Sequence, residues 1–160
     1  MSSSADPSTP FLSLIVPVYD EQDNLRHLHD AIVNALTNQT FEVIYVNDGS
    51  RDSSAQVLET IAKEDSRARV IHFVRNYGQT AALTAGIRSA RAELLVTLDA
   101  DLQNDPSDIP MMLTHLKDAD VVCGWRKDRK DAYLSRTFPS KIANWLISRL
   151  SNVYMHDYGC

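Results

Sequence analysis

Residues 94–103 read Leu-Leu-Val-Thr-Leu-Asp-Ala-Asp-Leu-Gln. The first five residues form a short, mostly apolar run, which is typical of a buried strand. The run ends abruptly in Asp99 and Asp101, which are separated by one residue. Two carboxylates at this spacing can bind a hard divalent cation such as Mg²⁺ or Mn²⁺, directly or through water. An ordinary turn or cap is the alternative interpretation of Asp-x-Asp.

Similar apolar runs alternate with helical periodicity along the chain. The expected strands cover residues 12–18, 41–46, 70–74, 94–98 and 120–123. Capping residues and apolar residues at helical spacing predict helices that begin near residues 23–24, 53–54, 80, 106–110 and 139. Strands that alternate with helices predict an α/β domain, a mostly parallel sheet flanked by helices. We expect residues 1–11 to be a disordered tail and residues 12–160 to be the domain.

The predicted topology indicates where a ligand would bind, because ligands of parallel α/β sheets sit beyond the carboxyl ends of the strands. The segments that follow the five expected strands are 19–21, 47–50, 75–78, 99–101 and 124–126. Asp48 can accept hydrogen bonds from a ribose or a base, and Arg126 can bind a phosphate with its planar guanidinium. An ordinary turn for Asp48 and a solvated side chain for Arg126 remain alternatives.

Several other chemistries are excluded by missing motifs. The first strand is not followed by the G-x-G-x-x-G of dinucleotide-binding proteins, and the chain has no P-loop. It also lacks the G-x-S-x-G of serine hydrolases, and its five histidines show no metal-binding spacing. A bound nucleotide would therefore not be held by a glycine-rich loop.

The charge distribution points to an anionic partner. The net charge of −5 argues against nucleic-acid binding. Residues 1–125 carry a net charge of −9, whereas residues 126–160 carry +4. An anion is the simplest partner for the basic segment, and a solvated basic face is the alternative. The two cysteines and the absence of a signal peptide or a long apolar run lead us to expect a cytoplasmic protein.

Four segments, taken in order, resemble one family. They are Val-Pro-Val-Tyr-Asp-Glu at 16–21, Val-Asn-Asp-Gly-Ser at 46–50, Arg-Asn-Tyr-Gly at 75–78 and Asp-Ala-Asp-Leu-Gln at 99–103. Together they resemble the nucleotide-sugar glycosyltransferases of family 2, and especially the polyprenyl-phosphate sugar transferases such as dolichol-phosphate mannose synthase. The resemblance covers residues 12–160 and implies the GT-A fold, in which a Rossmann-like, mostly parallel sheet is flanked by helices.

The resemblance also implies roles for individual residues. The residues that match nucleotide and donor contacts are Pro17, Tyr19, Glu21, Val46, Asp48 and Ala100. The residues that match the metal-binding and catalytic segment are Asp99, Asp101 and Gln103. Arg126 matches a contact to the donor or acceptor phosphate and is counted with the catalytic group, and Arg136 matches a contact to the lipid phosphate. The family usually has two aspartates where this chain has Asn47 and Asp48, but the nucleotide contact belongs to the second, which is kept.

The activity implied by the resemblance is transfer of a hexosyl group from a UDP- or GDP-sugar to a polyprenyl phosphate. We expect it to require Mg²⁺ or Mn²⁺, to invert the anomeric centre and to take place at the cytoplasmic face of a membrane, where the basic run 126–136 would meet anionic lipid. Two alternatives stay open, a saccharide hydroxyl as acceptor and a non-catalytic nucleotide-sugar-binding module. Because the family continues beyond the segment at 157–160, we expect the catalytic domain to be truncated at its C-terminal side.

Overall fold

The computed structural model describes residues 9–117 and 119–124. The chain divides into two compact units, Met1–Met111 and Met112–Cys160. The sheet and the candidate site described below belong to the first unit. Of the expected elements, the helix beginning near residue 139 and most of the tail lie outside the described residues.

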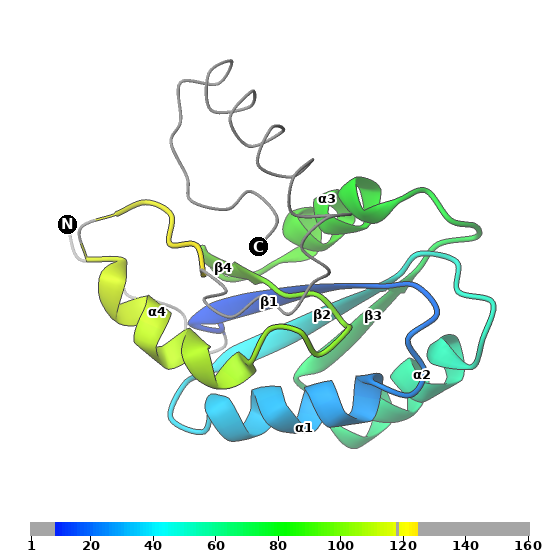
Figure 1. Ribbon diagram of the computed structural model, residues 1–160, viewed down its shortest axis with the longest axis horizontal. Coiled ribbons are helices and arrows are strands. Elements are labelled where there is room, and N and C mark those ends of the chain that lie inside the picture. The colour runs from blue at the N-terminus through cyan, green and yellow to red at the C-terminus, as the bar shows by residue number, and fades with distance from the viewer. Residues whose placement is uncertain (1–8, 118, 125–160) are drawn as a thin grey trace, which may run out of the picture. The chain divides into compact units, whose positions relative to one another are not determined.

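The first unit is built on a four-stranded parallel sheet (Figure 1). Its strands are β1 (Leu12–Val18), β2 (Phe41–Asn47), β3 (Ala68–His72) and β4 (Leu94–Thr97). They lie in the order β3-β2-β1-β4, with Leu12 opposite Phe41 in β2 and opposite Leu94 in β4. The helices are α1 (Leu25–Ala35), α2 (Ser54–Glu64), α3 (Gln79–Ser89), the 3₁₀ turn η1 (Pro106–Asp108) and α4 (Ile109–His115). The prediction of a mostly parallel α/β sheet is confirmed.

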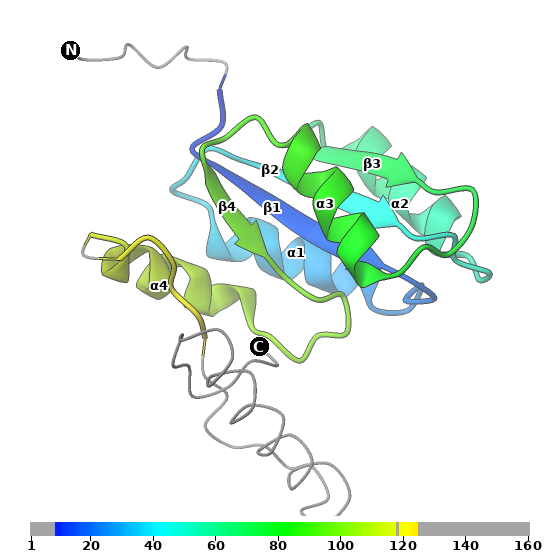
Figure 2. The same ribbon diagram turned by 90° about the horizontal axis from the view of Figure 1, so that it is seen from above.

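Helices cover both faces of the central strands. Figure 2 shows α3 on one face of the sheet and α1 and α2 on the other. Every residue of β2 is buried, as expected for a strand that lies between two helical layers. Ala82 of α3 packs in the core with Ile44 and Val46 of β2. A Cβ at Gly86 would lie 2.4 Å from Cγ2 of Ile15, so a glycine at this position lets α3 approach β1 closely.

Two of the expected strands differ from the observed structure. The third strand ends at His72 rather than at residue 74, and the Val74 side chain is 92% exposed. The expected fifth strand at 120–123 is wrong, because these residues form no strand and Val121 is 74% exposed. A short apolar segment becomes a strand only where a neighbouring strand supplies ladder hydrogen bonds. The sheet pairings of the described residues involve β1–β4 alone.

Two acidic groups, one buried and one partly buried, stabilise the sheet and the helices packed on it. Glu42, fully buried in β2, accepts hydrogen bonds from Ser13, from Arg69 and from both the backbone and the side chain of Arg91. Burial raises the pKa of Glu42, but these hydrogen bonds outweigh burial and leave the pKa below its usual value. Such complete pairing is what makes a buried charge tolerable.

The second group lies where α2 ends. Asp65 accepts hydrogen bonds from Nε and Nη2 of the Arg67 guanidinium and lies 3.2 Å from Nε2 of the buried His29. Nδ1 of His29 lies 3.0 Å from the hydroxyl of Tyr45. Burial lowers the pKa of His29 despite the nearby Asp65 carboxylate. This histidine is therefore a packing residue.

Candidate functional site

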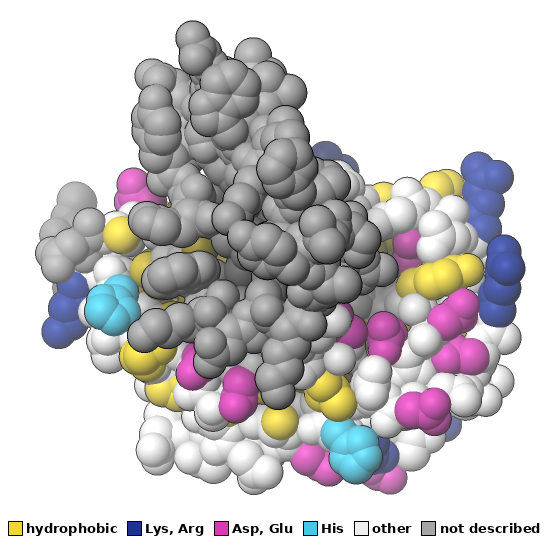
Figure 3. All heavy atoms as spheres, in the orientation of Figure 1, with side chains coloured by type: hydrophobic (Ala, Val, Ile, Leu, Met, Phe, Trp, Pro, Cys, Tyr) yellow, Lys and Arg dark blue, Asp and Glu magenta, His cyan; other side chains and the backbone are white. Residues whose placement is uncertain are grey.

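The loops that follow β1, β2 and β3 lie together at one end of the sheet (Figure 1). Figure 3 shows acidic side chains gathered on the visible surface at this end, with basic side chains beside them. This is the end at which parallel α/β sheets bind ligands. The predicted site residues before residue 112 fall on these loops, on the strand ends that lead into them, and on the loop that follows β4.

Asp48 ties the end of β2 to the start of α3. Its carboxylate is almost completely buried and accepts hydrogen bonds from the backbone N–H groups of Tyr77 (2.7 Å) and Gly78 (2.8 Å). A carboxylate has about four lone-pair sites, so each oxygen can accept a second hydrogen bond from a ligand. Asp48 thus fixes the loop before α3 and keeps acceptor capacity for a nucleotide.

The turn after Asp48 packs tightly against the loop that follows β3. Gly49 has φ +70°, and a Cβ on it would lie 2.4 Å from the carbonyl carbon of Arg75. Asn47 closes this turn, because its side-chain oxygen accepts the backbone N–H of Ser50 at 3.0 Å. The two loops can therefore approach each other only with glycine at position 49.

The loop after β1 is held against the start of α2. Asp20, at φ +56°, accepts the N–H of Arg51, and its own N–H donates to the hydroxyl of Ser50 (3.1 Å). The backbone N–H of Glu21 donates to the Ser54 hydroxyl, and its carboxylate accepts from the side chain of Asn24. These bonds place Glu21 beside the turn that carries Asp48.

The other predicted nucleotide residues of these strands differ in exposure. Tyr19 is 37% exposed at the end of β1, which leaves its ring accessible to a ligand. Pro17 is half-buried, and Val46 is buried under α3. Val46 therefore lies beneath the site as part of the core, and Tyr19 faces solvent above it.

Asp99 is tied to the start of α3. Its carboxylate accepts a hydrogen bond of 2.8 Å from the side-chain amide of Gln79, the first residue of that helix. The segment is anchored to the sheet because the N–H of Leu98 donates to the carbonyl of Ile15 (3.1 Å), and Ala100 is buried. Sequence reasoning missed Gln79, although it directly follows the Arg-Asn-Tyr-Gly segment at 75–78.

Asp101 lies on an exposed turn. Its carboxylate accepts the backbone N–H of Gln103 at 3.0 Å, and Leu102 between them has φ +60°. An Asx turn of this kind is the ordinary alternative that the sequence left open for Asp-x-Asp. The turn uses one oxygen of Asp101, so the carboxylate keeps acceptor capacity toward a cation.

The carboxylate oxygens of Asp99 and Asp101 are suitable ligands for a hard cation, although the described residues do not supply a full coordination shell. Within residues 9–117 and 119–124, no group of three or more His, Cys, Asp or Glu side chains is arranged to hold a metal. Mg²⁺ characteristically takes one or two carboxylates and completes its octahedron with water and substrate phosphates. Two carboxylates beside a phosphate-bearing ligand satisfy this requirement.

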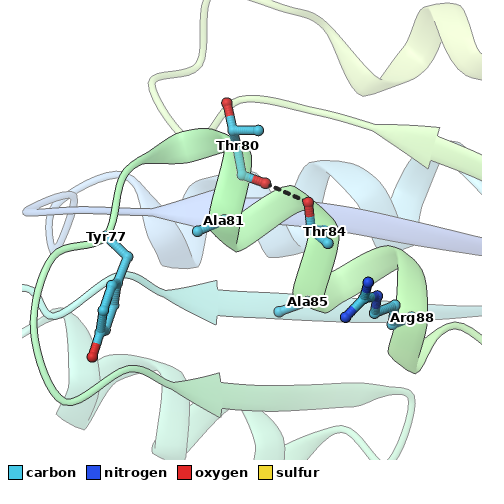
Figure 4. Close-up of a pocket in the computed structure, with 6 residues that line it drawn as sticks. All are labelled: Tyr77, Thr80, Ala81, Thr84, Ala85 and Arg88. Carbon is cyan, nitrogen blue, oxygen red and sulfur yellow. Dashed lines mark hydrogen bonds between the residues drawn. The ribbon is translucent and has the colours of Figure 1, made fainter.

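Arg126 and Arg136 lie outside the described residues. A groove of about 490 Å³ runs along α3, with Tyr77 at one end and Arg88 at the other (Figure 4). The residues that line it are Tyr77, Thr80, Ala81, Thr84, Ala85 and Arg88. None of the residues predicted to contact nucleotide, metal or phosphate lines the groove, although Tyr77, whose N–H donates to Asp48, does.

The chain is similar in sequence to proteins of one family. The family model described as glycosyl transferase family 2 matches residues 13–157. The chain is 42% identical over 154 residues to a dodecaprenyl-phosphate galacturonate synthase of Rhizobium johnstonii, covering 93% of this chain and 46% of that protein. It is 41% identical over 155 residues to an undecaprenyl-phosphate 4-deoxy-4-formamido-L-arabinose transferase of Pseudomonas fluorescens, covering 94% and 45%. The chain thus spans less than half the length of these relatives.

The fold is also similar to a solved glycosyltransferase. The mannosyltransferase PcManGT from Pyrobaculum calidifontis, in complex with GDP-Man and Mn²⁺, superposes with a TM-score of 0.62. The sequence identity is 22%, and the match covers 75% of this chain and 37% of that one. This likeness shows the GT-A fold. Among the described residues, no helix has the length and apolar character needed to cross a membrane.

Proposed function

Because the chain belongs to glycosyl transferase family 2, we propose that it binds a nucleotide sugar at the carboxyl ends of β1, β2 and β4 and transfers the sugar to a polyprenyl phosphate. One observation carries this proposal. Asp48, which directly follows β2, and Asp99, which lies beyond the end of β4, are hydrogen-bonded to Gly78 and Gln79, two consecutive residues at the start of α3. Asp48, the expected nucleotide contact, and Asp99, an expected metal ligand, are therefore both attached to the start of α3.

The nucleotide would be recognised by the groups at the ends of β1 and β2. Asp48 offers acceptor sites to base or ribose donors, since an ionised carboxylate only accepts hydrogen bonds. Tyr19 offers an accessible ring, and Glu21 lies beside the same turn. These features support a uridine or guanosine diphosphate sugar, and GDP-Man is the ligand of the structurally similar mannosyltransferase.

The diphosphate would be held at Asp99 and Asp101 together with Mg²⁺ or Mn²⁺. When bound there, the divalent cation would stabilise the negative charge that develops on the leaving diphosphate. Gln79 orients Asp99 by its 2.8 Å hydrogen bond, and the Asx turn with Gln103 orients Asp101. Both carboxylates are thus fixed before the ligand arrives, which lowers the cost of binding.

Transfer would be a single displacement with inversion. An oxygen of the acceptor phosphate forms a bond to the anomeric carbon, while the bond from that carbon to the diphosphate oxygen breaks. A phosphate is already ionised near neutral pH, so the attack needs little general-base help. The names of both relatives, which specify dodecaprenyl and undecaprenyl phosphate, support a lipid phosphate as acceptor.

The acceptor would reach the site from a membrane surface. The basic run 126–136 holds Arg126 and Arg136, the two residues proposed to contact phosphate. Each cation near an anionic leaflet contributes about 1 kcal/mol to membrane binding. We therefore place the reaction at the cytoplasmic face of a membrane.

A transfer assay tests this proposal. The chain is incubated with Mn²⁺, undecaprenyl phosphate in detergent and a panel of UDP- and GDP-linked sugars, and the lipid fraction is analysed for a phosphate-linked sugar. We expect one donor class to give this product and Asp101→Asn to abolish it. Asp108→Asn, at an exposed carboxylate on η1, is the matched control and should leave the product unchanged. A product on a saccharide hydroxyl but not on the lipid would contradict the proposed acceptor.

A further inference from the structure

A line of hydrogen bonds connects α2 with the loops of the candidate site. Nε2 of His72 lies 2.9 Å from the carboxylate of Glu59 on α2, and Nδ1 of His72 lies 3.0 Å from Nδ2 of Asn47. The Asn47 side-chain oxygen accepts the N–H of Ser50, and the Ser50 hydroxyl accepts the N–H of Asp20. Asn47 and His72 are directly opposite each other at the last paired position of β2 and β3.

These contacts allow one assignment of protons. The Ser50 N–H is a donor, so the oxygen of the Asn47 amide must face it and the NH₂ group must face His72. Nδ1 of His72 must then be the unprotonated acceptor. Nε2 must carry the proton, which it donates to the Glu59 carboxylate. In this arrangement His72 accepts a hydrogen bond at Nδ1 and donates one at Nε2, which corresponds to one tautomer.

We propose that His72 is a positioning residue for the nucleotide site, a role that rests on the function proposed above. Its Nδ1 holds the Asn47 amide in the single orientation that accepts the Ser50 N–H. Because Asn47 is 4% exposed, water does not readily replace a lost partner. His72 itself is partly exposed on α2's side of the sheet and touches no predicted nucleotide contact directly.

Loss of the hydrogen bond between His72 and Asn47 would affect the turn at residues 47–50. With the Asn47 amide turned over, its NH₂ group would face the N–H of Ser50, a donor against a donor. The turn 47–50 would loosen, and with it the close packing of Gly49 on the backbone of Arg75 and Asn76. The Ser50 hydroxyl that supports Asp20 would move as well. Loops on both sides of Asp48 therefore depend on His72.

Two substitutions of His72 separate its two contacts. The side-chain amide of asparagine occupies the position of Nδ1, so His72→Asn keeps an acceptor for Asn47. The side-chain amide of glutamine reaches the position of Nε2, so His72→Gln keeps the contact with Glu59 and loses the one with Asn47. Glu59→Gln preserves an acceptor for Nε2–H and is the control on the α2 side.

The first readout is nucleotide affinity, measured by calorimetry with UDP and with GDP in the presence of Mn²⁺. We expect His72→Gln to weaken the binding of the nucleotide that binds the wild type by roughly tenfold, the loss expected for one buried hydrogen bond. His72→Asn and Glu59→Gln should stay within about threefold of the wild type. Equal affinities for His72→Gln and the wild type would overturn the proposal.

The second readout does not depend on the proposed function. The ¹⁵N spectrum of the wild-type histidines should show His72 protonated at Nε2, and amide hydrogen exchange at Ser50 should be faster in His72→Gln than in His72→Asn. If the wild type binds neither nucleotide, the proposed function fails while these two measurements still decide the role of His72. Protonation at Nδ1 in the wild type would overturn the role even if His72→Gln does not fold.

Discussion

The carboxylate of Asp48 and the backbone N–H of Gly78 are joined by a hydrogen bond of 2.8 Å, which ties the end of β2 to the N-cap residue of α3. The first N–H groups of a helix lack partners within the helix, and a negative charge nearby is favourable. The Asp48 carboxylate accepts a hydrogen bond from one of these N–H groups and places its negative charge beside the start of α3. It also accepts the N–H of Tyr77. One buried carboxylate thus organises the loop that faces the proposed nucleotide.

Replacing Asp48 by asparagine tests this organising role. The new NH₂ group would face a backbone N–H, so one hydrogen bond is lost and two donors oppose each other. We expect the free energy of unfolding to fall by about 2 kcal/mol and nucleotide affinity to fall at least roughly tenfold. Denaturant unfolding and calorimetry measure the two effects. Asp108→Asn is the control, and wild-type values for Asp48→Asn would contradict the role.

The contact between the loops after β2 and β3 makes alanine unacceptable at position 49. Gly49→Ala adds a Cβ that would lie 2.4 Å from the Arg75 carbonyl carbon, at a residue whose φ is +70°. Strain and overpacking together should lower the free energy of unfolding by at least about 2 kcal/mol. Gly124→Ala, whose Cβ would meet Met112 at 3.9 Å, should change it by less than about 0.5 kcal/mol. Similar stabilities for the two variants in denaturant unfolding would contradict the packing.

The pH dependence of the free energy of unfolding should reveal the contribution of the ionised Asp65 carboxylate. Hydrogen bonds from Arg67 lower the pKa of Asp65 from 3.8 to about 2. Since the folded-state pKa is the lower one, the carboxylate stabilises the fold above about pH 4, and this contribution is lost as the pH falls toward 2. Asp65→Asn should reduce the free energy of unfolding at pH 7 and flatten its decline between pH 4 and 2. Unfolding curves at a series of pH values measure this.

A neighbouring carboxylate serves as the control for that experiment. Glu64 pairs with Arg26 at the surface, where both side chains are largely exposed. Surface pairs contribute little to stability, so Glu64→Gln should keep the wild-type profile. An equal flattening in Glu64→Gln, or none in Asp65→Asn, would contradict the assignment to Asp65.

The sequence predicted the parallel sheet and the segments that follow its strands because both depend on local patterns. Apolar runs such as 12–18 and 41–46 are long enough to form buried strands, and the topology brings their carboxyl ends to one edge. The predicted strand at 120–123 is wrong because its apolar character alone cannot supply a neighbour to pair with. The phosphate contacts expected of Arg126 and Arg136 stay predictions, because both residues lie outside the described part of the chain.

Partners that are distant in the sequence could not be predicted from it. Gln79 meets Asp99, and His72 meets Asn47, across separations of 20 and 25 residues. Periodicity indicates the face on which a side chain lies, but it does not indicate which polar atoms of two loops come within 3 Å. Asn47 departs from the family pattern, and no local sequence pattern indicates its contact with His72.

If Asp48, Asp99 and Asp101 form one metal-assisted nucleotide site, binding of the nucleotide to this chain depends on the metal. Calorimetric titration with UDP and with GDP, each with and without Mn²⁺, measures this dependence. We expect one nucleotide to bind in the presence of Mn²⁺ and Asp101→Asn to remove the dependence on the metal. A folded wild-type chain that binds neither nucleotide, or binds one equally well without Mn²⁺ and in Asp101→Asn, would contradict it.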